Sequence, residues 1–325
     1  MKFIVRIIRF IYRKTGNNFN EIVRKEQYKK FTILSENASN DYLKSLIDSG
    51  RPSMISRLGA VESNCILNWM QMREYATANL IQKVSASFKG NVSEWNEQVK
   101  IDLQNLAGFF PATDENLFRF CSIYTSKISQ ADAIVIWGFV PGENFIIKNY
   151  CASALKLDPQ VLDPYFFDSP WTSKLKNKKV LVIHPFAESI RFQYAKKELL
   201  FENKSILPDF ELHTIKTVQS IARNKTQFKD WFAALEFMKS EIVKVDFEIA
   251  LISGGAYGLP LAAFIKDLGK CAVHMGGSLQ ILFGIKGKRW DEHPPTAALY
   301  NEHWVRPALE EIVPKADIVE GGCYW

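Results

Sequence analysis

The sequence lacks three features that would assign it to a specialised class of protein. Its five cysteines, at positions 65, 121, 151, 271 and 323, form no Cys-x-x-Cys pair and are odd in number, which indicates a reducing cytosol and no structural zinc. No apolar run reaches the ~18 residues needed to cross a bilayer, because glutamate, glycines and a proline interrupt the best stretch, 247–265. The surplus of 41 basic over 35 acidic residues is too small to indicate a nucleic-acid partner.

What is present is the composition of an ordinary globular protein. The 325 residues are 47% hydrophobic and 23% charged, which excludes disordered, collagen-like and low-complexity classes. At roughly 100 to 200 residues per domain, this length accommodates two domains or one large α/β domain with helical additions.

The first 14 residues predict a cationic amphipathic helix. Its basic face consists of Lys2, Arg6, Arg9 and Arg13. Arginines interrupt its apolar part and no small-residue cleavage site follows, so we expect the segment to remain on the mature chain. This pattern is typical of an anchor on an anionic membrane surface, although packing on the protein body or on a partner would also explain it. Residues 15–50 are predicted to be a polar helical lead-in to the main domain, 51–325.

The N-terminal half of this domain predicts a strand followed by helices. Residues 51–57 are typical of a short strand, and residues 61–129 of a helical layer or lobe. We expect Ser93 to cap one helix, Gly108 to end it, and Thr113 to cap the next.

From residue 131 onward, short apolar segments alternate with helical ones. The predicted strands are 131–137, 179–184, 211–217, 247–253 and 271–275, and the predicted helices are 187–204, 225–244 and 258–268. Alternating β and α elements with continuously apolar strands predict an α/β fold: a doubly wound, mostly parallel sheet with an additional helical layer in the N-terminal half.

Two glycine turns follow neighbouring predicted strands, where an open parallel sheet binds its ligands. The first turn contains Ser253, Gly254, Gly255, Tyr257 and Gly258, and precedes a helix. Such a turn can hold an anion against backbone N–H groups, although a tight strand-to-helix connection explains it nearly as well.

The second turn contains Gly276 and leads to a basic loop. This loop carries Lys286, Lys288 and Arg289 ahead of Trp290, a combination that suits a diphosphate flanked by a flat ring. The alternative is an ordinary solvated basic loop.

His184 ends a predicted strand, and Glu188 lies in the first turn of the helix that follows. A histidine at a strand end can reach the crevice and bind substrate or act as a base near neutral pH, but a buried structural histidine is the commoner case.

Arg57, Gly59 and Glu62 form an Arg-x-Gly-x-x-Glu arrangement at the first strand-to-helix turn. The arginine can clamp a phosphate, the glycine leaves room for a ligand, and the carboxylate can bind a divalent ion or accept a proton. Alternatively, Arg57 and Glu62 simply pair with each other.

The segment from Ser53 to Glu62 resembles the opening motif of bacterial GT-D-type glycosyltransferases, in which Ser, Arg, Gly and Glu recur at this spacing. The strand ending in His184-Pro185, both glycine turns and the terminal Gly322-Cys-Tyr-Trp are similar to proteins of surface-polysaccharide gene clusters. This resemblance implies a Rossmann-like fold and transfer of a sugar from a nucleotide diphosphate donor, a UDP-sugar, to a growing or lipid-linked saccharide. The implied location is the cytoplasmic, inner face of the plasma membrane.

The sequence departs from that family at one position. Members commonly carry Asp-x-Glu, associated with Mn²⁺ or Mg²⁺, whereas Ala60 stands at the Asp position ahead of Glu62. Any ion would therefore depend on Glu62 and the donor phosphates. Two alternatives stay open: a non-catalytic, membrane-associated scaffold of a polysaccharide assembly complex, and a nicotinamide-dependent oxidoreductase. The latter lacks the expected acidic residue after a Gly-x-Gly-x-x-Gly turn.

Overall fold

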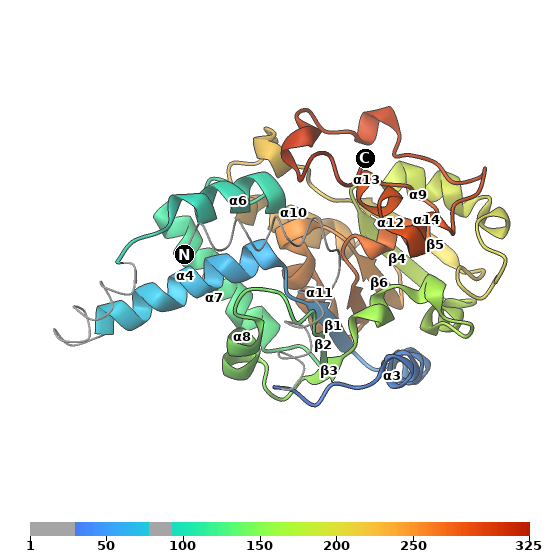
Figure 1. Cartoon of the computed structure of the whole chain (residues 1–325), viewed down its shortest axis with the longest axis horizontal. Helices are drawn as coiled ribbons and strands as arrows, with labels where there is room; N and C mark the ends of the chain where they lie inside the picture. The colour runs from blue at the N-terminus through green and yellow to red at the C-terminus, as the bar shows by residue number, and fades with distance from the viewer. Residues whose placement is uncertain (1–29, 78–92) are drawn as a thin grey trace.

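The computed structural model describes residues 30–77 and 93–325, and a seven-stranded sheet forms its centre (Figure 1). All the strand pairs of this sheet are parallel, and the strand order is β3-β2-β1-β7-β6-β4-β5. The strands are β1 (Ser53–Arg57), β2 (Ala133–Val135), β3 (Leu155–Leu157), β4 (Lys179–His184), β5 (Glu211–Lys216), β6 (Ile249–Ile252) and β7 (Cys271–His274). The predicted α/β class with a Rossmann-like parallel sheet is confirmed.

The central strands form because their residues are apolar on both faces. All four residues of β6 are buried, and the same is true of β7. The sequence did not predict β3, because its three residues include a lysine and give no apolar run. The predicted strand at 131–137 is real but shrinks to three residues.

Helices cover both faces of the sheet, each with its own hydrophobic core. The first core is formed by residues from the helices α4 (Ala60–Thr77), α6 (Glu97–Ala107), α7 (Asp114–Ile128), α8 (Glu143–Tyr150), α10 (Trp231–Ile242) and α11 (Gly258–Asp267). The second core involves α3 (Glu36–Ser49), α9 (Ala187–Tyr194) and α12 (Ser278–Leu282), with the short helix α13 (Lys288–Asp291) beside it. The short helix α14 spans Pro294–Ala297.

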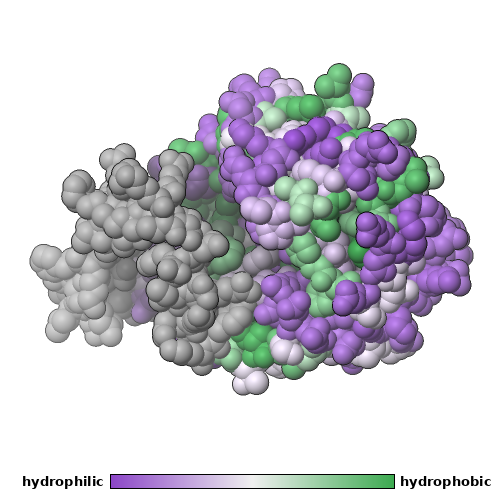
Figure 2. Space-filling model, turned by 45° about the vertical axis from the view of Figure 1, so that its right-hand side comes forward, coloured by the Kyte–Doolittle hydropathy of each residue, from purple (hydrophilic) through white to green (hydrophobic). Residues whose placement is uncertain are grey.

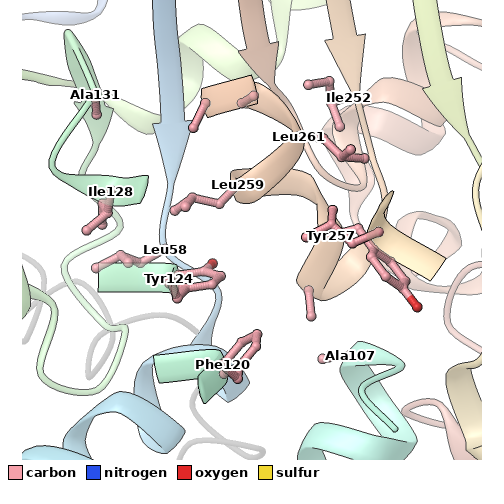
Figure 3. Close-up of a cluster of buried hydrophobic side chains, with 14 of the residues drawn as sticks. Leu58, Ala107, Phe120, Tyr124, Ile128, Ala131, Ile252, Tyr257, Leu259 and Leu261 are labelled. Atoms are coloured by element: carbon pink, nitrogen blue, oxygen red, sulfur yellow. The ribbon is translucent and has the colours of Figure 1, made fainter. Parts of the chain in front are cut away.

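Figure 3 shows part of the first core. Leu58 follows β1, Tyr124 belongs to α7 and Leu259 to α11, and all three are almost completely buried. Within the range 61–129, the described helices α4, α6 and α7 therefore pack on the sheet as a layer. Because Leu58 lies in the first strand-to-helix turn, this layer of helices also packs against that turn.

The caps of these helices are partly as predicted. Gly108 ends α6 with a φ of 75°, and Thr113 caps α7 through the N–H of Asn116, as expected. The Ser93 cap is wrong: Asn96 caps α6, because its side chain accepts the N–H of Gln98.

Two predicted helices are shorter than expected. The helix predicted over 187–204 ends at Tyr194, because a 3₁₀ turn, Lys197–Leu199, then brings Leu200 and Phe201 into the second core. The helix predicted over 225–244 begins only at Trp231, where Asp230 caps it.

No helix within residues 30–77 and 93–325 is long and apolar enough to cross a membrane. Hydrophobic residues do reach the surface, and Figure 2 shows them as a broken band between hydrophilic areas. The predicted membrane-surface helix, 1–14, lies outside the described residues, as does the first part of the predicted lead-in, 15–29. The described part of the lead-in contains α3, which packs into the second core.

Candidate functional site

A cavity opens at the edge of the sheet where the parallel strands end. It encloses about 690 Å³ of empty space, including the part open to solvent. Five neighbouring strands each contribute a lining residue at or just beyond their end, namely Arg57 (β1), Gly276 (β7), Ser253 (β6), His184 (β4) and Thr217 (β5). The cavity includes the junction of β6 and β4, where the strand connections change direction, because β6 leads to β7 on one side and β4 leads to β5 on the other. Such a point is the usual ligand position in these sheets.

Arg57 brings a positive charge to this cavity without an acidic partner. No carboxylate of residues 30–77 or 93–325 forms an ion pair with its guanidinium. Its Nε is buried with no hydrogen-bond partner, and Nη1 donates only a long bond of 3.4 Å to the Leu58 carbonyl. The guanidinium carbon lies 5.8 Å from the centre of the Trp137 ring. An arginine held in this way is suited to binding an anionic ligand.

The second glycine turn makes room for this arginine. A Cβ atom on Gly276 would lie 2.6 Å from Nε and Nη2 of Arg57, and the φ of 64° also favours glycine there. A Cβ on Gly277 would meet the rings of Trp290 and Tyr324. The structure therefore brings Gly276 and Arg57 together, although they are far apart in the sequence.

The first glycine turn has a different explanation. Ser253, Gly254, Gly255 and Tyr257, which the sequence indicated as candidate binding residues, line the cavity. However, a Cβ on Gly255 would lie 2.7 Å from the Ala107 carbonyl oxygen, and one on Gly258 would overlap the His274 ring. Packing against α6 and β7 therefore accounts for these two glycines, as the alternative interpretation of a tight connection proposed.

Glu62 lies at the start of α4, close to Arg57 but outside the cavity lining. Its side chain folds over Gly59, where a Cβ would overlap the carboxylate. Burial raises the pKa of Glu62, while its own backbone N–H and the charge of Arg57 oppose that rise. The two residues do not form an ion pair within the described chain, so simple pairing does not explain them.

The structure separates His184 from Glu188. His184 lines the cavity, and its Nδ1 accepts the N–H of Phe186 at 2.9 Å. Burial lowers the pKa of His184 to about 3, so the ring is neutral at pH 7, and its proton resides on Nε2. This geometry suits a hydrogen-bond donor to a ligand better than a general base. Glu188 is exposed, pairs with Arg191 and does not line the cavity.

The basic loop turns away from the cavity lining. Lys286 lies over the Tyr300 ring, Lys288 donates to the Gly321 carbonyl, and Arg289 pairs with Glu320. The loop thus holds the segment that ends in Tyr324 and Trp325. Those two aromatic residues do line the cavity.

Sequence reasoning missed three contributions to the site. The segment Thr217–Ile221 lines the cavity beyond β5, yet it carries no recognisable motif. Gln280 lines it from α12 and donates to the Tyr324 carbonyl. Glu143 accepts the N–H groups of Trp137 and Gly138 and thereby fixes the loop beneath Arg57. The sequence gives no signal for these contributions, because each depends on contacts between segments that are far apart in the chain or carry no motif.

The predicted metal is not matched by a set of protein ligands. Within residues 30–77 and 93–325, no three His, Cys, Asp or Glu side chains lie close enough together to hold an ion. Glu62 on its own does not make a Mn²⁺ or Mg²⁺ site, because such ions need several oxygen ligands. The described residues therefore do not fit a protein-held divalent ion.

Comparison with known proteins adds no assignment. No protein-family model, no curated protein and no solved structure matches the chain. The resemblance to GT-D-type glycosyltransferases stays a prediction.

Proposed function

We propose that the protein is a glycosyltransferase that moves a sugar from a nucleotide diphosphate donor, a UDP-sugar, to a saccharide or lipid-linked saccharide acceptor. Arg57 carries this proposal, because its guanidinium has no carboxylate partner in the described chain and faces a cavity at the strand ends. A leaving diphosphate develops negative charge during transfer, and a positioned arginine stabilises that charge. The Arg-x-Gly-x-x-Glu resemblance is consistent with this role.

The surrounding residues support the same chemistry. The N–H groups of Gly254 and Gly277 have no acceptor among the described residues and border the cavity, so they can donate to phosphate oxygens. His184 offers Nε2–H as a further neutral donor. Glu62 is the candidate base for the acceptor hydroxyl, because it lies beside Arg57 at the start of α4 and burial raises its pKa.

The proposed setting is a bacterial surface-polysaccharide pathway at the cytoplasmic face of the plasma membrane. An anchor within residues 1–14 would place the enzyme on anionic lipid beside a lipid-linked acceptor. The alternative scaffold would share the fold and the membrane surface but not the turnover.

The test is a screen of purified full-length protein against a panel of nucleotide sugars. Binding of a UDP-sugar should raise the melting temperature, because a ligand that binds only the folded state stabilises it. Slow release of UDP from the same donor should accompany this stabilisation. If no donor raises the melting temperature and no donor is hydrolysed, the enzyme proposal is refuted and the scaffold is favoured.

A further inference from the structure

The strand order gives the cavity a direction. Its lining residues at the strand ends follow the sequence β1, β7, β6, β4 and β5 across the sheet. Neighbouring strands lie about 4.8 Å apart, so the ends of β1 and β5 are separated by roughly 19 Å. That span suits an extended nucleotide lying across the strands.

The β1 end of the cavity is the anionic-ligand end. Arg57 is the only lysine or arginine among its described lining residues. Gly277, with its unpaired N–H, follows the adjacent strand β7. His184 also lines the cavity and could carry a positive charge, but burial lowers its pKa to about 3, so its ring is neutral at pH 7. Phosphate groups are therefore favoured beside β1 and β7.

The β5 end has the features of a site for a neutral, flat group with a polar edge. Gln219 donates from Nε2 to Thr217 at 3.3 Å, and its Oε1 has no partner in the described chain. The backbone N–H groups of Val218 and Gln219 are also without an acceptor there. Phe186, which follows β4, and Trp325, in the C-terminal segment, line the same cavity, and their ring centres lie 6.1 Å apart.

The backbone after this segment is held in an unusual conformation. Ala222 and Arg223 both have positive φ, at 55° and 58°, although neither is glycine. Arg223 donates to Asn105 at 3.0 Å, and Ala222 is buried against Val319 and Cys323. A left-handed backbone at two consecutive residues other than glycine is strained, and such strain is concentrated at ligand-binding and other functional sites.

We infer that the nucleotide of the proposed donor lies across the strand ends with its diphosphate beside Arg57 and its base beside Gln219, against the rings of Phe186 and Trp325. This inference rests on the proposed function. The Gln219 amide and the free backbone groups present donors and an acceptor to the polar edge of the base. The sugar of the donor then lies beyond the diphosphate, on the β1 side of the cavity.

The test compares nucleoside diphosphates with pyrophosphate, which shares only their diphosphate group. UDP is titrated calorimetrically into the full-length protein, with CDP, GDP, ADP and dTDP beside it, and pyrophosphate is measured by displacing the nucleotide that binds most tightly. Gln219→Leu should weaken nucleotide binding about tenfold, the effect of one lost hydrogen bond, and should leave pyrophosphate unchanged. Arg57→Gln should weaken the binding of both the nucleotide and pyrophosphate.

Matched controls separate this inference from a folding defect. Gln98→Leu makes the same change at an exposed position on α6 and should alter neither affinity. Trp325→Leu provides a second variant at the base end and should also affect only the nucleotide. Nucleotide affinity unchanged in both Gln219→Leu and Trp325→Leu would overturn the placement of the base while leaving the proposed function intact. A wild type that binds none of the five nucleotides would overturn the proposed function and this inference together.

Discussion

Arg57 and the basic loop 286–289 carry the same kind of charge, but the fold uses them differently. Arg57 has no carboxylate partner in the described chain and borders the cavity. In the loop, Lys288 and Arg289 are bound to Gly321 and Glu320 of the C-terminal segment. The sequence makes the loop look like the stronger anion site, because its charges are clustered. The structure shows that the availability of a charge, more than its density, distinguishes the two regions.

The two glycine turns show a similar difference. Gly255 avoids a backbone carbonyl of α6, whereas Gly276 leaves room for the guanidinium of Arg57. Of these two glycines, only Gly276 is required by the position of a residue with a candidate role in the chemistry, namely Arg57.

The largest expected effect concerns the buried carboxyl group of Glu143, which holds the backbone of Trp137, the residue whose ring lies next to Arg57. Burial raises the pKa of Glu143 from 4.5 to about 7, so the native state binds more protons than the unfolded state between these values. Stability should therefore fall as pH rises from about 4.5 to 7, by up to about 3 kcal/mol from this group. Urea unfolding at pH 5 and pH 8 should show that the free energy of unfolding falls less with rising pH in Glu143→Gln than in the wild type.

The loop provides the control for this experiment. Glu320 forms an exposed ion pair with Arg289, so Glu320→Gln should cost about 0 to 1 kcal/mol and keep the wild-type pH dependence. An identical pH slope in wild type and Glu143→Gln would mean that the carboxyl group is not destabilised by burial.

The next effect concerns catalysis beside Arg57. Glu62→Gln removes a buried carboxyl group with a raised pKa, so it should reduce sugar transfer by about 100-fold or more without lowering the melting temperature at pH 8. Rates with the identified donor and acceptor, measured with and without Mn²⁺, check this. Full transfer activity in the folded variant would show that Glu62 has only a structural role.

A smaller effect should follow from filling the space next to Arg57. Gly276→Ala places a Cβ against the guanidinium, so UDP binding should weaken about tenfold through loss of a charge-assisted hydrogen bond. Gly269→Ala is the matched control, since Gly269 also has positive φ, 80°, but a Cβ there would have no neighbour within 4 Å. Both variants should lose about 1 kcal/mol of stability. Equal UDP affinity in the two variants would mean that Gly276 serves only the turn.

The fold was largely predictable from the sequence, and the site only in part. Buried parallel strands such as β4 and β6 are continuous apolar runs, which the sequence shows directly. The Asn, Thr and Gly residues at helix ends act locally, so the sequence also indicates where helices begin and end. The predicted cap at Ser93 instead of Asn96 was an error of three residues. The strand β3 depends on pairing with β2, which no local pattern shows.

The site depends on contacts between distant segments. The sequence placed Arg57, His184 and the glycine turns at strand ends, and the structure brings them to one cavity. It could not show that Lys288 and Arg289 are bound to the C-terminal segment, or that Gln219 borders the same cavity. The first relation arises from the packing of the C-terminal segment on the loop, and the second from the strand order, which brings the end of β5 to the cavity.

The central claim is that Arg57, and not the basic loop, provides the charge for a diphosphate. Calorimetric titration of UDP into Arg57→Gln and into the double variant Lys286→Gln plus Lys288→Gln compares the two regions directly. We predict at least about tenfold weaker binding for Arg57→Gln, the effect of a lost charge-assisted hydrogen bond, and wild-type affinity for the loop variant. Wild-type affinity in Arg57→Gln together with weakened binding in the loop variant would contradict the account.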